Sequence, residues 1–421
     1  MGHAPHMHTF FAESLAQAEQ LQIILNHPPH VRISLFIFFS NYKGTMNTIV
    51  SVVPCRDYEL DAVRQALKGC LAPLGGIEHF VRPGMRVLLK PNLLAAAERE
   101  QAVTTHPAVV QAVAELARSA GGVVQIGDSP AGPIKDNPHI WRKSGMPAAD
   151  QSGASLVLFD GVNWQRHNGA DYLIARPVSE ADLVINLPKI KTHLMTLYTG
   201  AIKNLLGVVP GTHKTEMHIR SIGIQDFSRE LVNLLEIVRP GLTIMDGVWG
   251  LEGVGPGAGG PTHAYGCLAA SADAVALDAV ITRAMGYKPG EVLHVAQAGL
   301  RGLGISDPAC IQIVGPASVL EFGSLALPAS HWYMRAPAWV SAPIQGQIKL
   351  IPRFNPALCN GCAKCVQVCA GKALAKTHGS SNGKPPVLDK KLCISCMCCA
   401  EVCPQGSIEP ARSRLGQMLG L

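Results

Sequence analysis

Charged residues are scarce in this chain of 421 residues: Asp, Glu, Lys and Arg together make up 16% of it. With a mean hydropathy of +0.19, this composition excludes a disordered chain and indicates a well-packed globular protein. The formal net charge of +6 is too small to indicate nucleic acid as a partner. Long apolar runs are lacking as well. The run VRISLFIFF at 31–39 is too short to cross a bilayer and has no secretory cleavage site, so we predict neither a transmembrane segment nor a leader.

Familiar catalytic motifs are also missing from the sequence. The chain has no G-x-S-x-G, H-E-x-x-H or P-loop motif. The stretch GPGAGG at 255–260 formally matches the dinucleotide fingerprint, but Pro261 follows it and no helix is expected to open there. We therefore interpret this stretch as a loop with positive φ angles whose backbone N–H groups approach an anion.

Cysteine, in contrast, is plentiful near the C-terminus. Most of the 13 Cys lie in two runs with the same spacing, C-x2-C-x2-C-x3-C. This is the pattern of bacterial ferredoxins with two 4Fe–4S clusters, in which the fourth Cys of each run ligates the other cluster. The predicted ligands are Cys359, Cys362, Cys365 and Cys403 for the first cluster, and Cys393, Cys396, Cys399 and Cys369 for the second.

Other interpretations of the cysteines fit less well. Disulfides would need an oxidising compartment, and zinc sites would use paired C-x2-C motifs. Cys398, next to Cys399, is an alternative cluster ligand. Cys70, Cys267 and Cys310 are expected to be buried, inert thiols. Reduced thiols together with clusters predict a cytoplasmic location.

The sequence pattern changes at Met46. From there on, short apolar runs alternate with amphipathic runs of helical period. This alternation predicts an α/β domain with a mostly parallel sheet covered by helices, followed by a small α+β ferredoxin-like domain. The TTHP stretch at 104–107 and Asp273 are expected to cap helices. Residues 1–45 are predicted to be an N-terminal extension outside the native fold, with an appended interaction segment as the alternative. The other predicted parts are the α/β domain at 46–320, a linker at 321–354, the ferredoxin domain at 355–412 and a tail at 413–421.

Several predicted strands end in polar side chains that a sheet does not need for packing. In open α/β sheets, ligands bind in the crevice at the carboxyl ends of the strands. We therefore predict a crevice lined by Lys90, Asn92, Asp128, Asn186, Lys189, Lys191, His193 and Asp246.

The densest part of this crevice is the segment 186–220, in which Lys and His interleave with small and apolar residues around a single acid, Glu216. Buried cations need anionic partners, which here are either Asp128, Asp246 and Glu252 or an anionic ligand. We favour the ligand. Substrate binding is assigned to Lys90, Asn92, Asn186, Lys189, Lys203, His213 and Lys214, and catalysis to His193, Lys191, Asp128 and Asp246.

Seven stretches taken together, LLKPN, TTHP, GDSP, DLVINLPKIKTH, KNLLG, VVPGTHK and DGVWGLEGVGPGAGGP, give the chain a family likeness. Over residues 46–412 it resembles domain-of-unknown-function family 362, in the form fused to a ferredoxin domain. The resemblance implies an iron–sulfur protein of the kind described as an oxidoreductase or ferredoxin. It supplies no agreed catalytic residues.

These features predict an oxidoreductase that passes low-potential electrons through two 4Fe–4S clusters to an anionic substrate in the crevice. His193 or His213 would supply protons, and Asp128 or Asp246 would orient those groups or hold a metal. One alternative is an electron carrier or subunit that docks to a protein partner. Another is a maturation scaffold that hands on metal or clusters, with Cys398 as a spare thiolate. The sequence alone does not separate the first two, and both need a protein that donates or accepts electrons.

Overall fold

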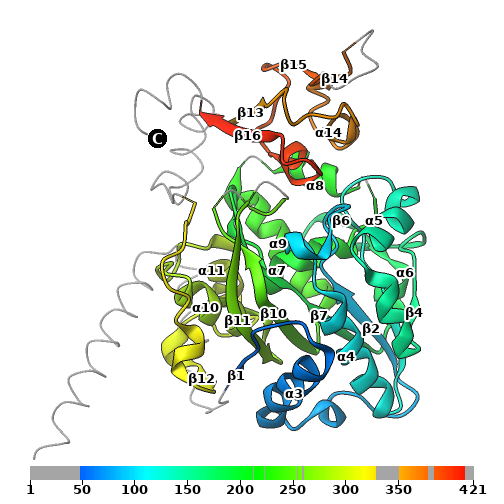
Figure 1. The fold of residues 1–421 in the computed structure, drawn as a ribbon, viewed down its shortest axis with the longest axis vertical. Helices are drawn as coiled ribbons and strands as arrows, with labels where there is room; N and C mark the ends of the chain where they lie inside the picture. The colour runs from blue at the N-terminus through cyan, green and yellow to red at the C-terminus, as the bar shows by residue number, and fades with distance from the viewer. Residues whose placement is uncertain are drawn as a thin grey trace, which may run out of the picture. The chain divides into compact units, whose positions relative to one another are not determined.

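The computed structural model describes residues 48–211, 213–221, 223–253, 255–257, 260–328, 350–377 and 384–412 (Figure 1). The chain divides into two units, Met1–Asn47 and Thr48–Leu421, and all described residues belong to the second. The predicted extension at 1–45, the tail at 413–421 and most of the predicted linker therefore lie outside the described residues. No helix in the described part of the chain is long and apolar enough to span a membrane.

The core of the larger domain is one sheet with the strand order β12-β1-β11-β10-β7-β2-β3-β4. Neighbouring strands are parallel except where β11 pairs antiparallel with β1 and with β10. Two short strands, β8 and β9, extend it beside β10. The strands are β1 Ile49–Pro54, β2 Arg86–Pro91, β3 Val123–Ile126, β4 Ser155–Leu156, β7 Leu183–Leu187, β8 Lys189–His193, β9 Leu197–Tyr198, β10 Leu242–Leu251, β11 Thr262–Ser271 and β12 Gln312–Val314; a separate hairpin joins β5 Val162–His167 to β6 Ala170–Ala175.

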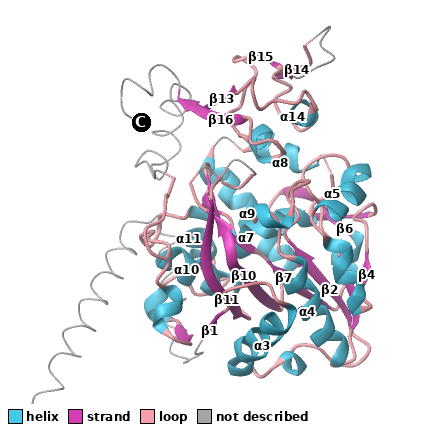
Figure 2. Cartoon of the chain, in the orientation of Figure 1, coloured by secondary structure: helices cyan, strands magenta, loops and turns pink. Residues whose placement is uncertain are grey.

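Helices cover both faces of this sheet (Figure 2). Successive residues of a strand point to opposite faces, and in β2 the side chain of Leu88 packs into one hydrophobic core while Val87 and Leu89 pack into the other. The helices α3 and α4 contribute to the core of Leu89, and α9 and α10 to that of Leu88. The helices are α3 Leu60–Leu71, α4 Pro107–Ser119, α5 Asn137–Lys143, α6 Arg176–Glu180, α7 Gly200–Asn204, α8 His213–Arg220, α9 Ile224–Val238, α10 Ala274–Ala284 and α11 Leu293–Leu300. The mostly parallel, helix-covered sheet predicted from the sequence is confirmed.

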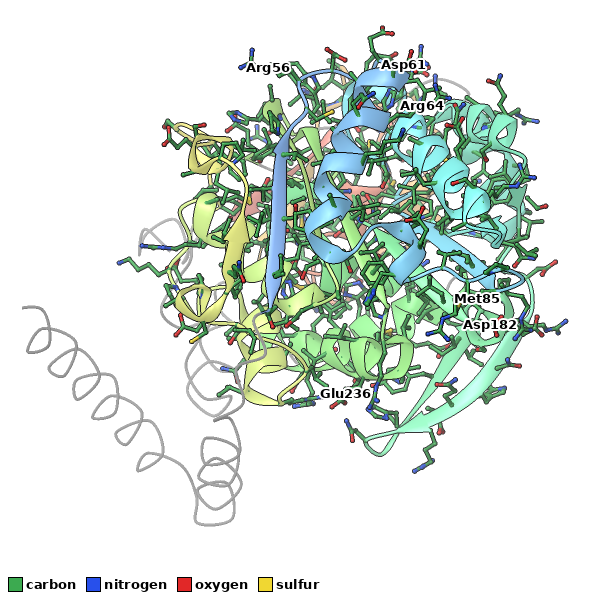
Figure 3. The ribbon with its side chains drawn as sticks, turned by 90° about the horizontal axis from the view of Figure 1, so that it is seen from below. Arg56, Asp61, Arg64, Met85, Asp182 and Glu236 are labelled. Atoms are coloured by element: carbon green, nitrogen blue, oxygen red, sulfur yellow. The ribbon has the colours of Figure 1, made fainter. Side chains whose placement is uncertain are left out.

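The helix boundaries follow from local chemistry. Asp273 accepts hydrogen bonds from the backbone N–H groups of Val275 and Ala276, so it caps α10 as predicted. In the TTHP stretch the cap of α4 is His106, whose Nδ1 accepts from Ala108 N–H. On the outer surface, Arg64 of α3 pairs with Asp61 and reaches Glu115 of α4, which ties these two helices together (Figure 3).

The C-terminal region is a small α+β unit, as the sequence predicts. Strand β13 Leu350–Phe354 pairs antiparallel with β16 Ile408–Arg412, and β14 Leu374–Ala375 pairs with β15 Val387–Leu388. Each cysteine run carries one short helix, α14 Lys364–Gln367 or α15 Cys398–Glu401. The first strand of this unit starts inside the stretch predicted to be a linker.

Two features differ from the sequence-based expectations. The stretch Lys189–His193 is a buried strand of its own, β8, because Pro188 separates it from β7 and it pairs with β10 further along that strand than β7 does. Cys310 is exposed, so its prediction as a buried thiol is wrong, whereas Cys70 and Cys267 are buried as expected.

Candidate functional site

The four cysteines predicted to hold the first cluster line one cavity. Cys359, Cys362, Cys365 and Cys403 surround a space of about 220 Å³ whose lining comes entirely from residues of the C-terminal unit. Burial, followed by the charges of Cys362, Cys403 and Cys359, raises the pKa of the Cys365 thiol to about 11. Since mutual repulsion of thiolates requires proximity, this agrees with the crossed ligand set.

The second predicted set is also close together. The pKa of Cys399 is raised by burial and by the charges of nearby cysteines, which are Cys396, Cys365, Cys393 and Cys369. Cys399 packs in the interior of the C-terminal unit near Cys369, whereas Cys398 packs with Cys396 of that unit and with Ala131 of the larger domain. Both cysteines therefore lie beside a predicted ligand of the second set, and the assignment of Cys399 stays a prediction from the spacing.

The cysteine spacing, and not a metal-like grouping of side chains, is the basis for expecting clusters here. Within the described ranges, no three His, Cys, Asp or Glu side chains converge closely enough to hold one ion. A cubane distributes its ligands over four irons, so its cysteines do not need to meet at one point.

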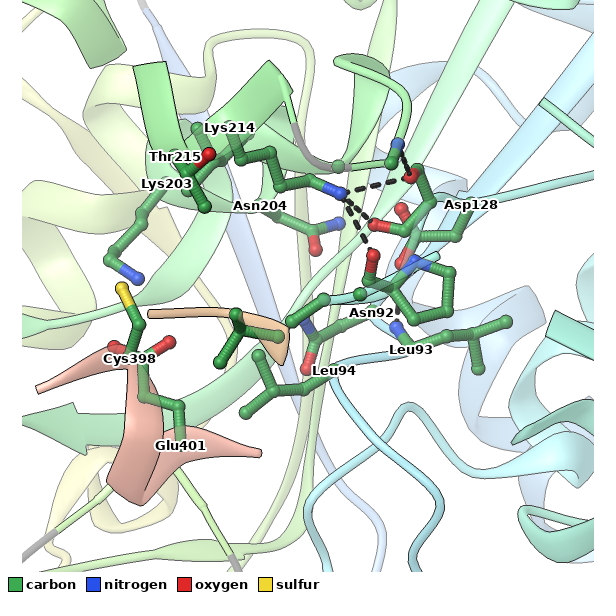
Figure 4. Close-up of a pocket in the computed structure, with 18 of the residues that line it drawn as sticks. Asn92, Leu93, Leu94, Asp128, Lys203, Asn204, Lys214, Thr215, Cys398 and Glu401 are labelled. Carbon is green, nitrogen blue, oxygen red and sulfur yellow. Dashed lines mark hydrogen bonds between the residues drawn. The ribbon is translucent and has the colours of Figure 1, made fainter. Parts of the chain in front are cut away.

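A second cavity, of about 90 Å³, lies where the larger domain meets the C-terminal unit (Figure 4). Its lining is rich in cations and in polar groups from the ends of β2 and β3 and from α7 and α8. The C-terminal unit contributes Val368, Cys398 and Glu401. The larger domain contributes among others Lys90, Asn92, Asp128, Ser129, Lys203, Asn204, Lys214, Thr215 and His218.

One cation of this cavity is satisfied by its surroundings. The Lys90 ammonium lies 2.8 Å from Asp128 Oδ1, with both side chains no more than 3% exposed. It also donates to Asn204 Oδ1 and to the Pro91 carbonyl. A Cβ at Gly207 would stand 2.0 Å from Asp128 Oδ1 and 2.5 Å from Lys90 Nζ, so only glycine permits this close approach. Lys90 and Asp128 thus neutralise each other.

Lys214 reaches the cavity from α8, and no carboxylate in the described part of the chain pairs with it. Its ammonium donates to the carbonyl and hydroxyl oxygens of Ser129 and to the carbonyl of Pro130. Burial lowers its pKa to about 7, although Asp128 opposes this shift.

Lys203 is the least satisfied cation. Its side chain is 9% exposed, yet within the described residues its ammonium has neither a carboxylate within 4 Å nor an acceptor in hydrogen-bonding range. Burial lowers its pKa, opposed by the charges of Glu401 and Cys398. Figure 4 shows its ammonium directed toward the Cys398 sulfur. An uncompensated buried cation is costly, and an anionic ligand would remove that cost.

Short α7 holds Lys203 in place. Gly200 at its first position has φ +72°, and Asp278 accepts hydrogen bonds from the N–H groups of Ala201 and Ile202 at 2.7 and 2.9 Å. The next residue, Asn204, donates to Asn186 Oδ1 and to the carbonyl of Lys90. Asn186 therefore supports the site without lining the cavity.

Glu401 is the residue that sequence reasoning missed. It extends from α15 and lies 2.9 Å from Nε2 of His193 in the larger domain. Burial alone would raise its pKa, but the charges of Lys203 and His193 outweigh burial and lower the pKa to about 2. The sequence offered no signal for it, because a Glu inside a cysteine run has the ordinary appearance of a helix residue.

The predicted residue His193 and the glycine-rich loop both lie at the boundary with the C-terminal unit. His193 lines a separate cavity of about 280 Å³ together with Gly255, Pro256 and Gly257 of the glycine-rich loop. A Cβ at Gly257 would stand 2.8 Å from the Glu401 carbonyl, so this loop is a close contact with the C-terminal unit.

The remaining predicted residues lie elsewhere. Lys189 and Asp246 form a buried pair at 2.8 Å, completed by the hydroxyl of Tyr58. Lys191 donates to Asn92 Oδ1 and to the carbonyl of Val103, and it lines neither boundary cavity.

His213 is also absent from the cavity. Its side chain is 43% exposed and faces Glu216. The imidazole that lines the cavity is His218, which stacks on Phe227 with 4.3 Å between ring centroids.

Comparison with known proteins shows to which class and family of proteins this chain belongs. The C-terminal residues 386–409 match the 4Fe–4S binding domain, so the protein is an iron–sulfur protein. Residues 87–283 match the domain of unknown function DUF362. The thylakoid-associated protein sll1697 of Synechocystis sp. is 36% identical over 277 residues, which cover 64% of this chain and 83% of that protein. The chain belongs to the DUF362 family, in a form with a C-terminal 4Fe–4S domain.

One solved structure is a distant match. The lactate racemase apoprotein from Thermoanaerobacterium thermosaccharolyticum aligns with a TM-score of 0.32 and 13% identity, over 47% of this chain and half of the racemase. A likeness at this level carries no argument about chemistry.

Proposed function

We propose that this iron–sulfur protein is an oxidoreductase that reduces a small anionic substrate in the cavity between its two domains. The observation that carries the proposal is the composition of the cavity wall. One side holds Lys203 and Lys214, which contact no carboxylate among the described residues, and the other side is built from Val368 and Cys398, which are adjacent in sequence to predicted cluster ligands.

The chain's own residues would bind and orient the substrate. Lys203 and Lys214 attract an anion into a water-poor space, where charge attraction is stronger than in bulk water. Asn92 and Thr215 offer polar contacts along the same wall. Burial lowers the pKa of His218 to about 4, so its neutral imidazole would orient the bound molecule by hydrogen bonding. When bound by the predicted cysteines, 4Fe–4S clusters supply single low-potential electrons.

The original residue assignment changes with the geometry. We assign anion binding to Lys203 and Lys214, while Lys90 and Asp128 form a neutral pair that shapes the floor of the cavity. Lys189 and Asp246 support the fold in a satisfied network. His193 joins the domains through Glu401.

The test uses anaerobically purified, reduced protein and follows cluster absorbance after addition of small anionic metabolites from a host extract. We expect Lys203→Met to slow reoxidation by about 10- to 100-fold, because a charge-assisted hydrogen bond contributes about 1.5–3 kcal/mol. Lys203→Arg should retain part of the rate, and Lys288→Met, an exposed position of the larger domain, should change nothing.

The electron-carrier alternative predicts a different result. The clusters would then reoxidise only when a protein fraction is added, and Lys203→Met would have no effect at unchanged iron content. That combination would exclude the proposed reduction of a small anion.

A further inference from the structure

The first cluster cavity faces a different environment from the second predicted ligand set. All of its lining residues belong to the C-terminal unit, and Cys362 is exposed. The second ligand set, in contrast, neighbours Val368 and Cys398 in the domain boundary. An electron donor can therefore approach the first predicted ligand set from outside, whereas the second predicted set lies beside the cavity proposed for the substrate.

The accessible entry is basic. Three lysines, Lys364, Lys376 and Lys384, line the cavity together with the cysteines, and no acidic side chain of the described residues does. Lys372, Lys390 and Lys391 add exposed positive charge to the same small unit. Its exposed acids are only Asp389 and Glu409 among the residues that the structure describes, since Glu401 is engaged with His193 at the domain boundary.

Apolar side chains accompany these lysines. Leu358, next to Cys359, is 49% exposed, and Val387, next to the cavity-lining Pro386, is 60% exposed. Exposed large apolar side chains beside a charged rim are typical of protein interfaces, in which desolvated apolar contacts give affinity and rim charges give orientation.

We propose that this basic face, defined as Lys364, Lys376 and Lys384 with Leu358 and Val387, is the docking surface for an acidic electron-donor protein. Charge complementarity selects the occupant. A positive rim around an exposed redox site attracts a negatively charged carrier and accelerates its encounter. It repels a basic carrier, and a second copy of this face would be repelled in the same way.

The experiment measures binding, without substrate and without turnover. The probe is an oxidised, acidic plant-type 2Fe–2S ferredoxin, titrated calorimetrically into the intact, cluster-loaded protein. We expect saturable binding at about 0.01 M salt that weakens strongly at about 0.15 M, where the Debye length is about 8 Å. The double variant Lys376→Glu, Lys384→Glu should bind more than about tenfold more weakly, because like charges then face each other.

The matched control is Lys288→Glu, which makes the same charge change at an exposed position of the larger domain. Iron content is checked for each variant, and Lys376→Gln with Lys384→Gln replaces the double reversal if that variant loses iron. Equal binding by wild type and variant, tighter binding of a basic cytochrome, or no binding at low salt would each overturn the proposal. None of these outcomes depends on whether Lys203 binds a substrate, so the two proposals fail separately.

Discussion

At the scale of single residues, the presence of a carboxylate partner distinguishes lysines that look alike in the sequence. Lys90 and Lys189 each have a carboxylate at 2.8 Å, whereas Lys203 and Lys214 have none within the described residues. Charge alone therefore does not identify a binding residue. A lysine at the cavity that lacks a carboxylate partner among the described residues is the better candidate.

Lys214 gives the site a pH dependence. Its pKa is about 7 in the folded protein, so the ammonium that attracts an anion is lost as pH rises through 7. We expect anion affinity to fall by up to about tenfold per pH unit above this value. Lys214→Arg should flatten the profile, because a guanidinium stays protonated. Anion affinity measured between pH 6 and about 9 tests this; an unchanged slope in the arginine variant would remove Lys214 from the explanation.

The lowered pKa of Lys214 also determines the direction in which the stability of the folded protein changes with pH. The unfolded lysine keeps its proton up to its ordinary value of 10.5, whereas the folded one releases it near 7. Between these values the unfolded state binds more protons, so this group makes the ligand-free protein more stable as pH rises.

At the scale of elements, α15 is both part of a cysteine run and a wall of the cavity that we propose binds the substrate. Its Glu401 pairs with His193 of β8, and its backbone lies against Gly257. A helix of four residues cannot hold itself in place, so these contacts determine where Cys398 stands.

We expect Glu401→Ala to destabilise the intact protein by about 1–3 kcal/mol, because it leaves the buried Nε2 of His193 without the carboxylate that lies 2.9 Å away. Glu401→Gln should cost less, since it keeps a hydrogen-bonding group. Anaerobic chemical denaturation followed through cluster absorbance gives the free energies. Glu409→Ala, an exposed position of the same unit, is the control; a loss as large as that of Glu401→Ala would show that the pair is not responsible.

At the scale of the whole molecule, the sequence predicted the architecture better than the site. Alternating apolar and amphipathic runs identified β1, β2, β3, β7 and α9, because burial on two faces of a sheet imposes local periodicity. The antiparallel strand β11 was not predicted, since its pairing with β1 and β10 depends on distant chain segments. Glu401 was missed for the same reason, as its partners lie far away in the sequence.

The cysteine spacing makes a prediction about the intact protein. Two clusters imply about eight irons per chain. We expect Cys399→Ser to reduce iron by about half, because Cys399 occupies a ligand position of the C-x2-C-x2-C-x3-C run, and Cys398→Ser to leave iron unchanged, because Cys398 lies outside that spacing. Iron analysis together with electron paramagnetic resonance of the reduced protein measures both. Iron loss in the Cys398 variant alone would reverse the ligand assignment.

Because α15 belongs to a cysteine run and also lines the cavity, exposure of the protein to oxygen would affect both. If the second predicted cluster is present, oxygen that destroys it would also release α15, the helix that carries Cys398 and Glu401. The damaged protein would then bind the proposed substrate more weakly and would also no longer receive electrons through this cluster. We expect such a protein to stop sequestering its metabolite once it can no longer convert it, which leaves that metabolite free for intact copies.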